Sequence, residues 1–155
     1  MSTYTKTVRR PQVILLVEDS PQDRESTKRA FTKSKVINPI IECEDGDKAL
    51  DYLFRRNKFS NPGASPRPGI ILLDLNMPGT DGFEVLAEIK KDNELKKIPV
   101  IVLTTSSDER DIDKCYSQGA NSYVQKPVDL HAFLKAVGRL QNYWLEIAIL
   151  PKMEE

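Results

Sequence analysis

Short apolar runs alternate with amphipathic stretches along this chain. Five runs rich in β-branched and aliphatic residues are typical of strands and cover residues 13–17, 37–43, 70–73, 100–103 and 122–124. The first, third and fourth are apolar almost throughout, as expected for parallel strands that are covered on both faces. The pattern therefore predicts a central parallel sheet.

The stretches that separate and follow these runs are predicted to be helices. Ser20, Pro21 and Asp23 provide an N-cap, a proline at the first helical position and an acidic first turn, so a helix begins there and runs to about Lys35. Four more helices have apolar residues at helical spacing over residues 46–55, 81–91, 108–118 and 128–140. Strands that alternate with helices five times predict one α/β domain, a doubly wound parallel sheet with right-handed crossovers.

Three segments do not belong to this alternation. Residues 1–12 are basic and rich in hydroxyls and are expected to form a flexible arm, whereas residues 56–69 form a long loop with three prolines and two glycines. Residues 141–155 stay hydrophobic after the domain of residues 13–140 has its five helices; the apolar side chains are Tyr143, Trp144, Leu145, Ile147, Ile149 and Leu150. Exposed together they would form a large apolar patch. The tail therefore either builds a homodimer or folds back onto the core of its own chain.

Composition excludes several classes of function. Lys and Arg number 23, as do Asp and Glu, so the chain has no net charge to hold it on nucleic acid or on an anionic membrane. No apolar run approaches the roughly 18 residues of a membrane span. Cys43 and Cys115 are too few for a disulfide scaffold, which favours free thiols and a cytoplasmic location.

Charged and hydroxyl side chains follow four of the five predicted strands. Glu18 and Asp19 follow the first strand, and the third is followed by Asp74; Thr104 and Lys126 follow the fourth and fifth. Because ligands of such sheets bind beyond the carboxyl ends of the strands, these groups are expected to meet there. Clustered carboxylates favour a hard cation such as Mg²⁺. Each residue alone also has an ordinary explanation, as a helix cap, a turn residue or a surface charge, but four coincidences at four strand ends are improbable.

Four motifs at these positions resemble the receiver domain of two-component response regulators. They read VILLVEDS, ILLDLNMPGTDG, IPVIVLTTS and SYVQKP, in the family's order, within residues 13–140. The resemblance implies a flavodoxin-like sheet of strand order 2-1-3-4-5. It also implies a phosphoryl acceptor at Asp74 that receives its phosphoryl group from a histidine kinase.

The resemblance implies roles for the other site residues as well. Glu18 and Asp19, with Asp74 and the backbone carbonyl of Asn76, would bind Mg²⁺. Thr104 would be the switch hydroxyl and Tyr123 the switch aromatic; Lys126 would bind the phosphoryl group, with a cis bond to Pro127. The loop before the third strand and the tail YWLEIAILP also resemble small regulators that are paired with cyanobacterial phytochromes.

Two other functions compete with a receiver. Phosphatases with an aspartate nucleophile also place Asp, Thr and Lys at strand ends, but they usually carry a second Asp two residues later, where this chain has Asn76. A pseudo-receiver that binds partners without phosphorylation is disfavoured because the acidic, hydroxyl and lysine positions are all intact. No DNA-binding or catalytic module follows in the sequence. Output is therefore expected through a changed partner surface or a homodimer formed by the fourth helix, the fifth strand, the fifth helix and the tail.

Overall fold

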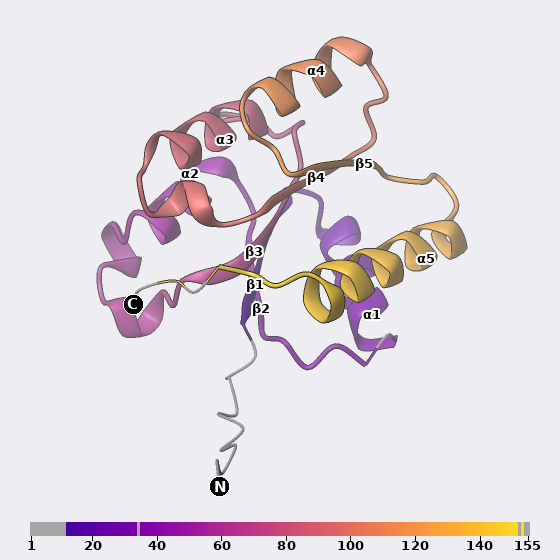
Figure 1. The fold of residues 1–155 in the computed structure, drawn as a ribbon, viewed down its shortest axis with the longest axis horizontal. Coiled ribbons are helices and arrows are strands. Elements are labelled where there is room, and N and C mark those ends of the chain that lie inside the picture. The colour runs from indigo at the N-terminus through magenta and orange to yellow at the C-terminus, as the bar shows by residue number, and fades with distance from the viewer. Residues whose placement is uncertain (1–11, 34, 152, 154–155) are drawn as a thin grey trace, which may run out of the picture.

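The computed structural model describes residues 12–33, 35–151 and 153, and its centre is a parallel sheet (Figure 1). The strands are β1 (Val13–Val17), β2 (Ile40–Cys43), β3 (Pro68–Leu73), β4 (Val100–Thr104) and β5 (Ser122–Gln125). They pair in parallel in the order β2-β1-β3-β4-β5. The α/β class, the doubly wound sheet and the predicted strand order are confirmed.

Five helices cover the two faces of the sheet, with α1 and α5 on one face and α2, α3 and α4 on the other (Figure 1). Their bounds are α1 (Pro21–Lys33), α2 (Gly46–Leu53), α3 (Gly82–Lys91), α4 (Glu109–Ser117) and α5 (Leu130–Gln141). Alternate residues of β1 enter different clusters: Leu15 packs on the side of α2 and α3, and Leu16 on the side of α1 and α5. Burial on both faces explains why β1, β3 and β4 are apolar at nearly every position.

A capping side chain precedes each of the five helices. The Ser20 hydroxyl accepts a hydrogen bond of 3.2 Å from the Asp23 N–H, as predicted for α1. An aspartate side chain caps each of the other four helices at residues 45, 81, 108 and 129. Each cap satisfies an N–H group that has no partner within its helix.

Some predicted bounds are wrong by a few residues. Residues 37–39 are not part of β2: Ile37 is exposed, and the Asn38 amide donates instead to the Gln12 carbonyl at 2.9 Å. Helix α2 ends at Leu53, not at Arg55, because Arg55 has a left-handed φ of 54° that a helix does not tolerate. Strand β3 begins two residues early, at Pro68, which is the position in a strand where proline is tolerated.

The predicted long loop is held by specific contacts. It contains two short 3₁₀ helices, η1 (Asn57–Phe59) and η2 (Pro62–Ala64). The buried Ser65 hydroxyl donates to the Phe59 carbonyl at 3.0 Å, and the Tyr52 hydroxyl donates to the Pro66 carbonyl at 2.6 Å. The first bond joins two parts of the loop, and the second fixes the loop against α2.

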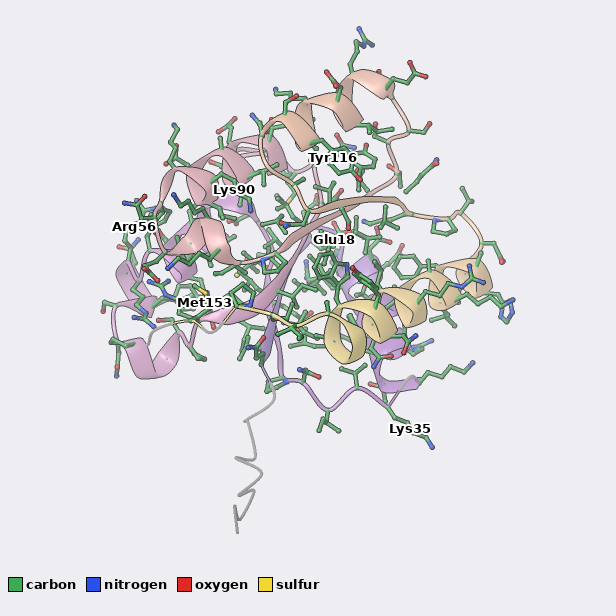
Figure 2. The ribbon with its side chains drawn as sticks, in the orientation of Figure 1. Glu18, Lys35, Arg56, Lys90, Tyr116 and Met153 are labelled. Carbon is green, nitrogen blue, oxygen red and sulfur yellow. The ribbon has the colours of Figure 1, made fainter. Side chains whose placement is uncertain are left out.

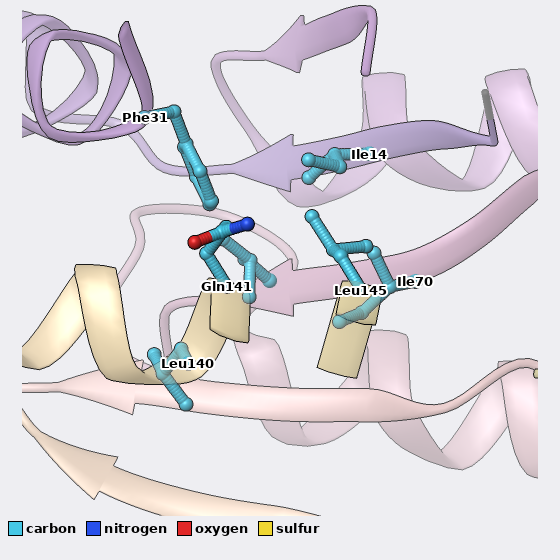
Figure 3. A pocket seen from close by; sticks show the side chains of 7 residues that line it. Ile14, Phe31, Ile70, Leu140, Gln141 and Leu145 are labelled. Atoms are coloured by element: carbon cyan, nitrogen blue, oxygen red, sulfur yellow. The ribbon is translucent and has the colours of Figure 1, made fainter. Parts of the chain in front are cut away.

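The tail continues α5 as a π-helical segment, η4 (Asn142–Ile147), and then runs on across the molecule, away from α5 (Figure 1). Trp144 and Leu145 pack against the cluster under α1 and α5, and Met153 packs against the cluster on the opposite face. Leu145 also lines a small apolar cavity together with Ile14, Phe31, Ile70, Leu72, Leu140 and Gln141 (Figure 3). Part of the tail therefore completes the core of its own chain.

Other side chains of the tail remain exposed. Tyr143 and Ile149 are 52% and 93% exposed. The predicted arm lies outside the described residues except for Gln12. No helix in the described part of the chain is long and apolar enough to cross a membrane.

Candidate functional site

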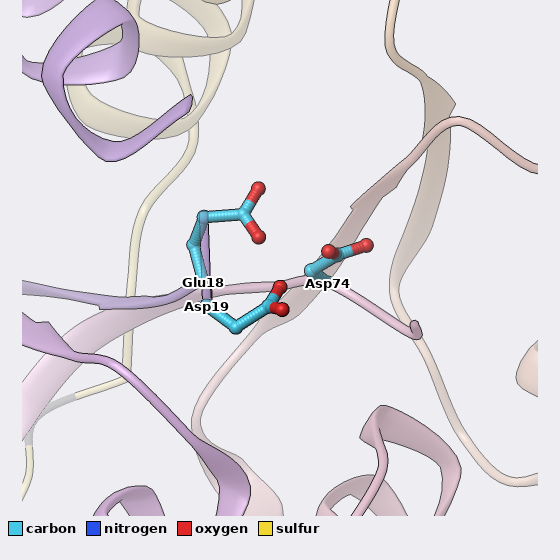
Figure 4. Close-up of side chains that lie close together, drawn as sticks. All are labelled: Glu18, Asp19 and Asp74. Carbon is cyan, nitrogen blue, oxygen red and sulfur yellow. The ribbon is translucent and has the colours of Figure 1, made fainter. Parts of the chain in front are cut away.

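Three carboxylates converge beyond the carboxyl ends of β1 and β3. Oxygen atoms of Glu18, Asp19 and Asp74 all lie within 4.8 Å of one another, and Figure 4 shows the three groups facing a common space. Glu18 lies in the middle of the molecule (Figure 2), and Glu18 and Asp74 are only 2% and 8% exposed. Such close and buried like charges repel one another unless a proton or a cation separates them.

Lys126, which follows β5, supplies the nearest cation. Its buried ammonium group contacts the Glu18 carboxylate and lies 3.8 Å from the nearer carboxylate oxygen of Asp74. It also donates a hydrogen bond of 2.9 Å to the Asp23 carboxylate. The lysine predicted from the sequence thus lies among the predicted carboxylates, and Asp23 is an additional partner.

The electrostatics of the site follow from burial. Desolvation and the hydrogen bond with Asp74 raise the pKa of Glu18 to about 8, although Lys126 opposes the shift. Burial alone would lower the pKa of Lys126, but the hydrogen bond with Glu18 and the charges of Asp74 and Glu18 outweigh it and hold that pKa above its ordinary value. Without a metal ion, the site therefore favours the protonated form of Glu18 and the charged form of Lys126.

Backbone contacts fix the loops that carry these groups. The Arg24 guanidinium donates to the carbonyls of Glu18 and Asp19 at 2.8 and 3.1 Å, which ties the end of β1 to α1. Gly82 packs against the backbone of Asp74, where a Cβ atom would collide with the Asp74 carbonyl oxygen. A glycine is required there because the two backbone segments approach so closely. Sequence reasoning did not identify Arg24 or Gly82 as supports of the site.

The predicted switch residues lie at the end of β4 and on β5, and both contact Ser106 in the loop that follows β4. Thr104 is fully buried at the end of β4. The Tyr123 hydroxyl donates to the Ser106 carbonyl at 2.9 Å, and the Ser106 hydroxyl donates to the Asp111 carboxylate of α4 at 2.7 Å. These bonds connect β5, the loop and the start of α4.

Two expectations for the site have different outcomes. Asn76 lies two residues beyond Asp74 and is exposed, and the role of its backbone carbonyl as a metal ligand stays a prediction. Among the described residues no peptide bond is cis, so the cis bond expected between Lys126 and Pro127 is wrong. The trans form of an X–Pro bond is favoured by about 0.5–1 kcal/mol when nothing imposes the cis form.

Comparisons with known proteins agree with this geometry. Residues 14–138 match the family model described as the response regulator receiver domain. The chain is 43% identical over 141 residues to response regulator Rcp1 of Synechocystis sp., and the match covers 91% of this chain and 94% of that protein. The crystal structure of the phosphorylated cyanobacterial phytochrome response regulator RcpA matches with a TM-score of 0.87 and 40% identity, covering 92% of this chain and all of that one. The Mn²⁺-bound form of Rcp1 matches with a TM-score of 0.86 and 43% identity over the same shares.

The chain therefore belongs to the response regulator receiver family, as its four motifs indicated. Its relatives include regulators of cyanobacterial phytochromes, in agreement with the resemblance of the loop and the tail. Its acidic cluster lies in a domain type for which a relative has been solved with a bound divalent cation. The family match does not support the alternative function as a phosphatase.

Proposed function

We propose that Asp74 accepts a phosphoryl group from a phosphorylated histidine of a kinase. An Asp74 carboxylate oxygen would attack the phosphorus atom in line, forming a P–O bond as the P–N bond breaks, and the departing imidazole takes up a proton. The observation that carries the proposal is the position of Asp74 at the end of β3, beside two other carboxylates and 3.8 Å from the Lys126 ammonium. In such reactions the protein mainly positions the groups and neutralises charge.

We further propose that the site takes Mg²⁺. The carboxylates of Glu18, Asp19 and Asp74 and the backbone carbonyl of Asn76 would hold it, since Mg²⁺ prefers oxygen ligands and keeps several waters. The ion would neutralise negative charge on the transferred group. Lys126 would bind a phosphoryl oxygen, which leaves the chain's own groups to orient Asp74 and to hold the lysine charged.

The output would be a shift between two conformations of one surface. A phosphoryl group adds roughly 1.5 to 2 negative charges, and the Thr104 hydroxyl can turn towards it. Tyr123, bonded to the same loop through Ser106, would follow the movement of Thr104 and change the face formed by α4, β5 and α5. The phosphoryl group would thus favour one of two states that already exist. The receiver would catalyse only its own phosphorylation and dephosphorylation.

The partners follow from the relatives and from the surface. A phytochrome-type histidine kinase is the proposed donor, because the RcpA structure is described as a phytochrome response regulator. A homodimer through α4, β5, α5 and the tail is supported by the exposed side chains of Val128, Leu130 and Tyr143. We propose no nucleic-acid partner and no membrane partner.

The cytoplasm is the proposed location because Cys43 and Cys115 are both free and buried. We retain residues 1–12, 13–140 and 141–155 as the proposed arm, receiver domain and extension.

Labelling with a small phosphodonor tests the acceptor. Acetyl phosphate with Mg²⁺ should add one phosphoryl group, stable to acid and labile to base, and Asp74→Asn should abolish it because an amide is no nucleophile. Asp113→Asn is the matched control. Asp113 is exposed on α4, so this variant should be labelled as fully as the wild type. Full labelling of Asp74→Asn would rule out Asp74 as the acceptor. Steady turnover of small phosphate esters would favour the phosphatase instead.

A further inference from the structure

Asp23 contacts the site from outside the set of residues that the receiver motifs assign. It lies in the first turn of α1, and its carboxylate accepts a hydrogen bond of 2.9 Å from the Lys126 ammonium, 103 positions along the chain. The same ammonium is 3.8 Å from Asp74, which is too far for a hydrogen bond. In this state Lys126 is therefore bonded to Glu18 and Asp23 and not to the proposed acceptor.

We propose that Asp23 is a positioning residue that holds Lys126 back from Asp74 until a phosphoryl group arrives. This inference rests on the proposed function, in which Lys126 binds a phosphoryl oxygen on Asp74. The lysine cannot move towards the phosphoryl group without weakening one of its two present hydrogen bonds, to Glu18 and to Asp23. Asp23 and the phosphoryl group thus compete for one ammonium.

Solvent exposure decides which ion pair breaks. The Glu18 side chain is 3% exposed, so loss of Lys126 would leave a buried carboxyl oxygen without its hydrogen-bond donor and out of reach of water, which is costly. The Asp23 side chain is 43% exposed, so water can solvate its carboxylate when the lysine leaves. Asp23 is therefore the partner that Lys126 releases, and the strength of this half-exposed pair sets how readily the lysine becomes available.

The ordinary explanation of Asp23 is a favourable acidic residue near a helix N-terminus. That explanation needs a negative charge in the first turn but no lysine, and the Ser20 hydroxyl already binds the Asp23 N–H. The two explanations differ in what they predict for the site. A purely helical role affects the stability of α1, whereas a positioning role changes the affinity for a phosphoryl group and the environment of Lys126.

Beryllofluoride, a stable mimic of the phosphoryl group, provides the affinity test. With Mg²⁺ present, Asp23→Asn should bind beryllofluoride about 3- to 5-fold more tightly than the wild type, the effect of one half-exposed ion pair. Asp23→Glu restores the charge and should return the affinity towards the wild-type value. Glu25→Gln is the matched control: it removes one charge from the same helix, at a side chain that is 62% exposed and paired with Lys28, and it should leave the affinity unchanged.

The ¹³Cε chemical shift of Lys126, assigned by its absence in Lys126→Met, provides a second readout. In Asp23→Asn without beryllofluoride, this shift should move towards the value of the beryllofluoride-bound wild type. An unchanged chemical shift, or an affinity equal to or weaker than that of the wild type, would overturn this inference but leave the proposed function standing. If the wild type and Asp74→Asn bind beryllofluoride equally, the proposed function fails and the inference with it.

Discussion

Glu18 is the residue whose chemistry depends most on its surroundings. As a sequence position it is an acidic residue after a strand, but in the fold its burial and its contact with Asp74 raise its pKa from 4.5 to about 8. The folded metal-free protein therefore binds a proton there that the unfolded chain has released. A cation that binds to the three carboxylates must displace that proton.

This proton predicts a pH dependence of stability in the metal-free protein. The contribution of Glu18 is fully present below pH 4.5 and is lost as the pH rises towards about 8, because the folded state holds the extra proton in that window. The melting temperature of the wild type should thus fall between pH 5 and pH 8 relative to that of Glu18→Gln, which has no proton to lose there. Parallel melting curves for the two proteins across these pH values would contradict the assignment.

Mg²⁺ should reverse this loss of stability. A cation that relieves the repulsion among Glu18, Asp19 and Asp74 stabilises the folded state by mass action, and it competes with the Glu18 proton. Millimolar Mg²⁺ should raise the melting temperature more at pH 8 than at pH 6, and Asp19→Asn should weaken Mg²⁺ binding by about tenfold or more. Asp113→Asn, on exposed α4, is the control. A melting temperature indifferent to Mg²⁺ at both pH values would exclude the metal site.

The sequence predicted which side chains would meet beyond the strand ends, but not their partners. Glu18, Asp74 and Lys126 could be predicted to meet because each follows a strand of one parallel sheet. Asp23 and Arg24 were not predicted as part of the site, because an acidic residue followed by a basic one in the first turn of a helix has the same pattern in any surface helix. Only the packing of α1 beside the end of β5 brings Asp23 to Lys126.

At the scale of elements, the helices and strands were predicted more accurately than their ends. The apolar pattern continues through Ile37, but Pro39 cannot donate to a strand ladder and Ile37 is exposed, so β2 begins only at Ile40. The loop after α2 was predicted without structure because its order depends on distant contacts. One of these is the hydrogen bond from Tyr52 to the Pro66 carbonyl.

The contact between α4 and β5 is an element-scale feature with a testable cost. Strand β5 is at the edge of the sheet, and the Tyr116 hydroxyl of α4 accepts a hydrogen bond of 3.1 Å from the Tyr123 N–H. Tyr116→Phe should lower the free energy of unfolding by about 1 kcal/mol and speed hydrogen exchange at the Tyr123 amide. Tyr143→Phe, at an exposed tyrosine of the tail, is the matched control and should change neither quantity. Equal exchange in all three proteins would show that the bond does not hold α4 on β5.

At the scale of the whole molecule, the tail has two kinds of surface. The sequence left open whether the tail packs on its own chain or on a second copy, because hydrophobicity does not say which surface it covers. The fold answers for some side chains: Trp144 and Leu145 pack over the α1–α5 face, and Met153 reaches the other cluster. Among the described apolar side chains of the tail, Tyr143 and Ile149 remain exposed and are available to a partner.

These two surfaces predict different effects for two substitutions. Leu145→Ala removes a side chain that packs near Ile14 and Phe31, so it should lower the free energy of unfolding by about 1–2 kcal/mol, less than the same substitution at a fully buried leucine.

Tyr143→Ala should change the free energy of unfolding of the monomer by no more than about 0.5 kcal/mol. If the proposed homodimer forms through the exposed side of the tail, Tyr143→Ala should shift it towards monomer in sedimentation at micromolar concentration, because aromatic anchors carry much of an interface's binding energy. A dimer that Tyr143→Ala leaves intact would place the interface elsewhere, and a wild type that is monomeric with and without phosphoryl on Asp74 would exclude the dimer.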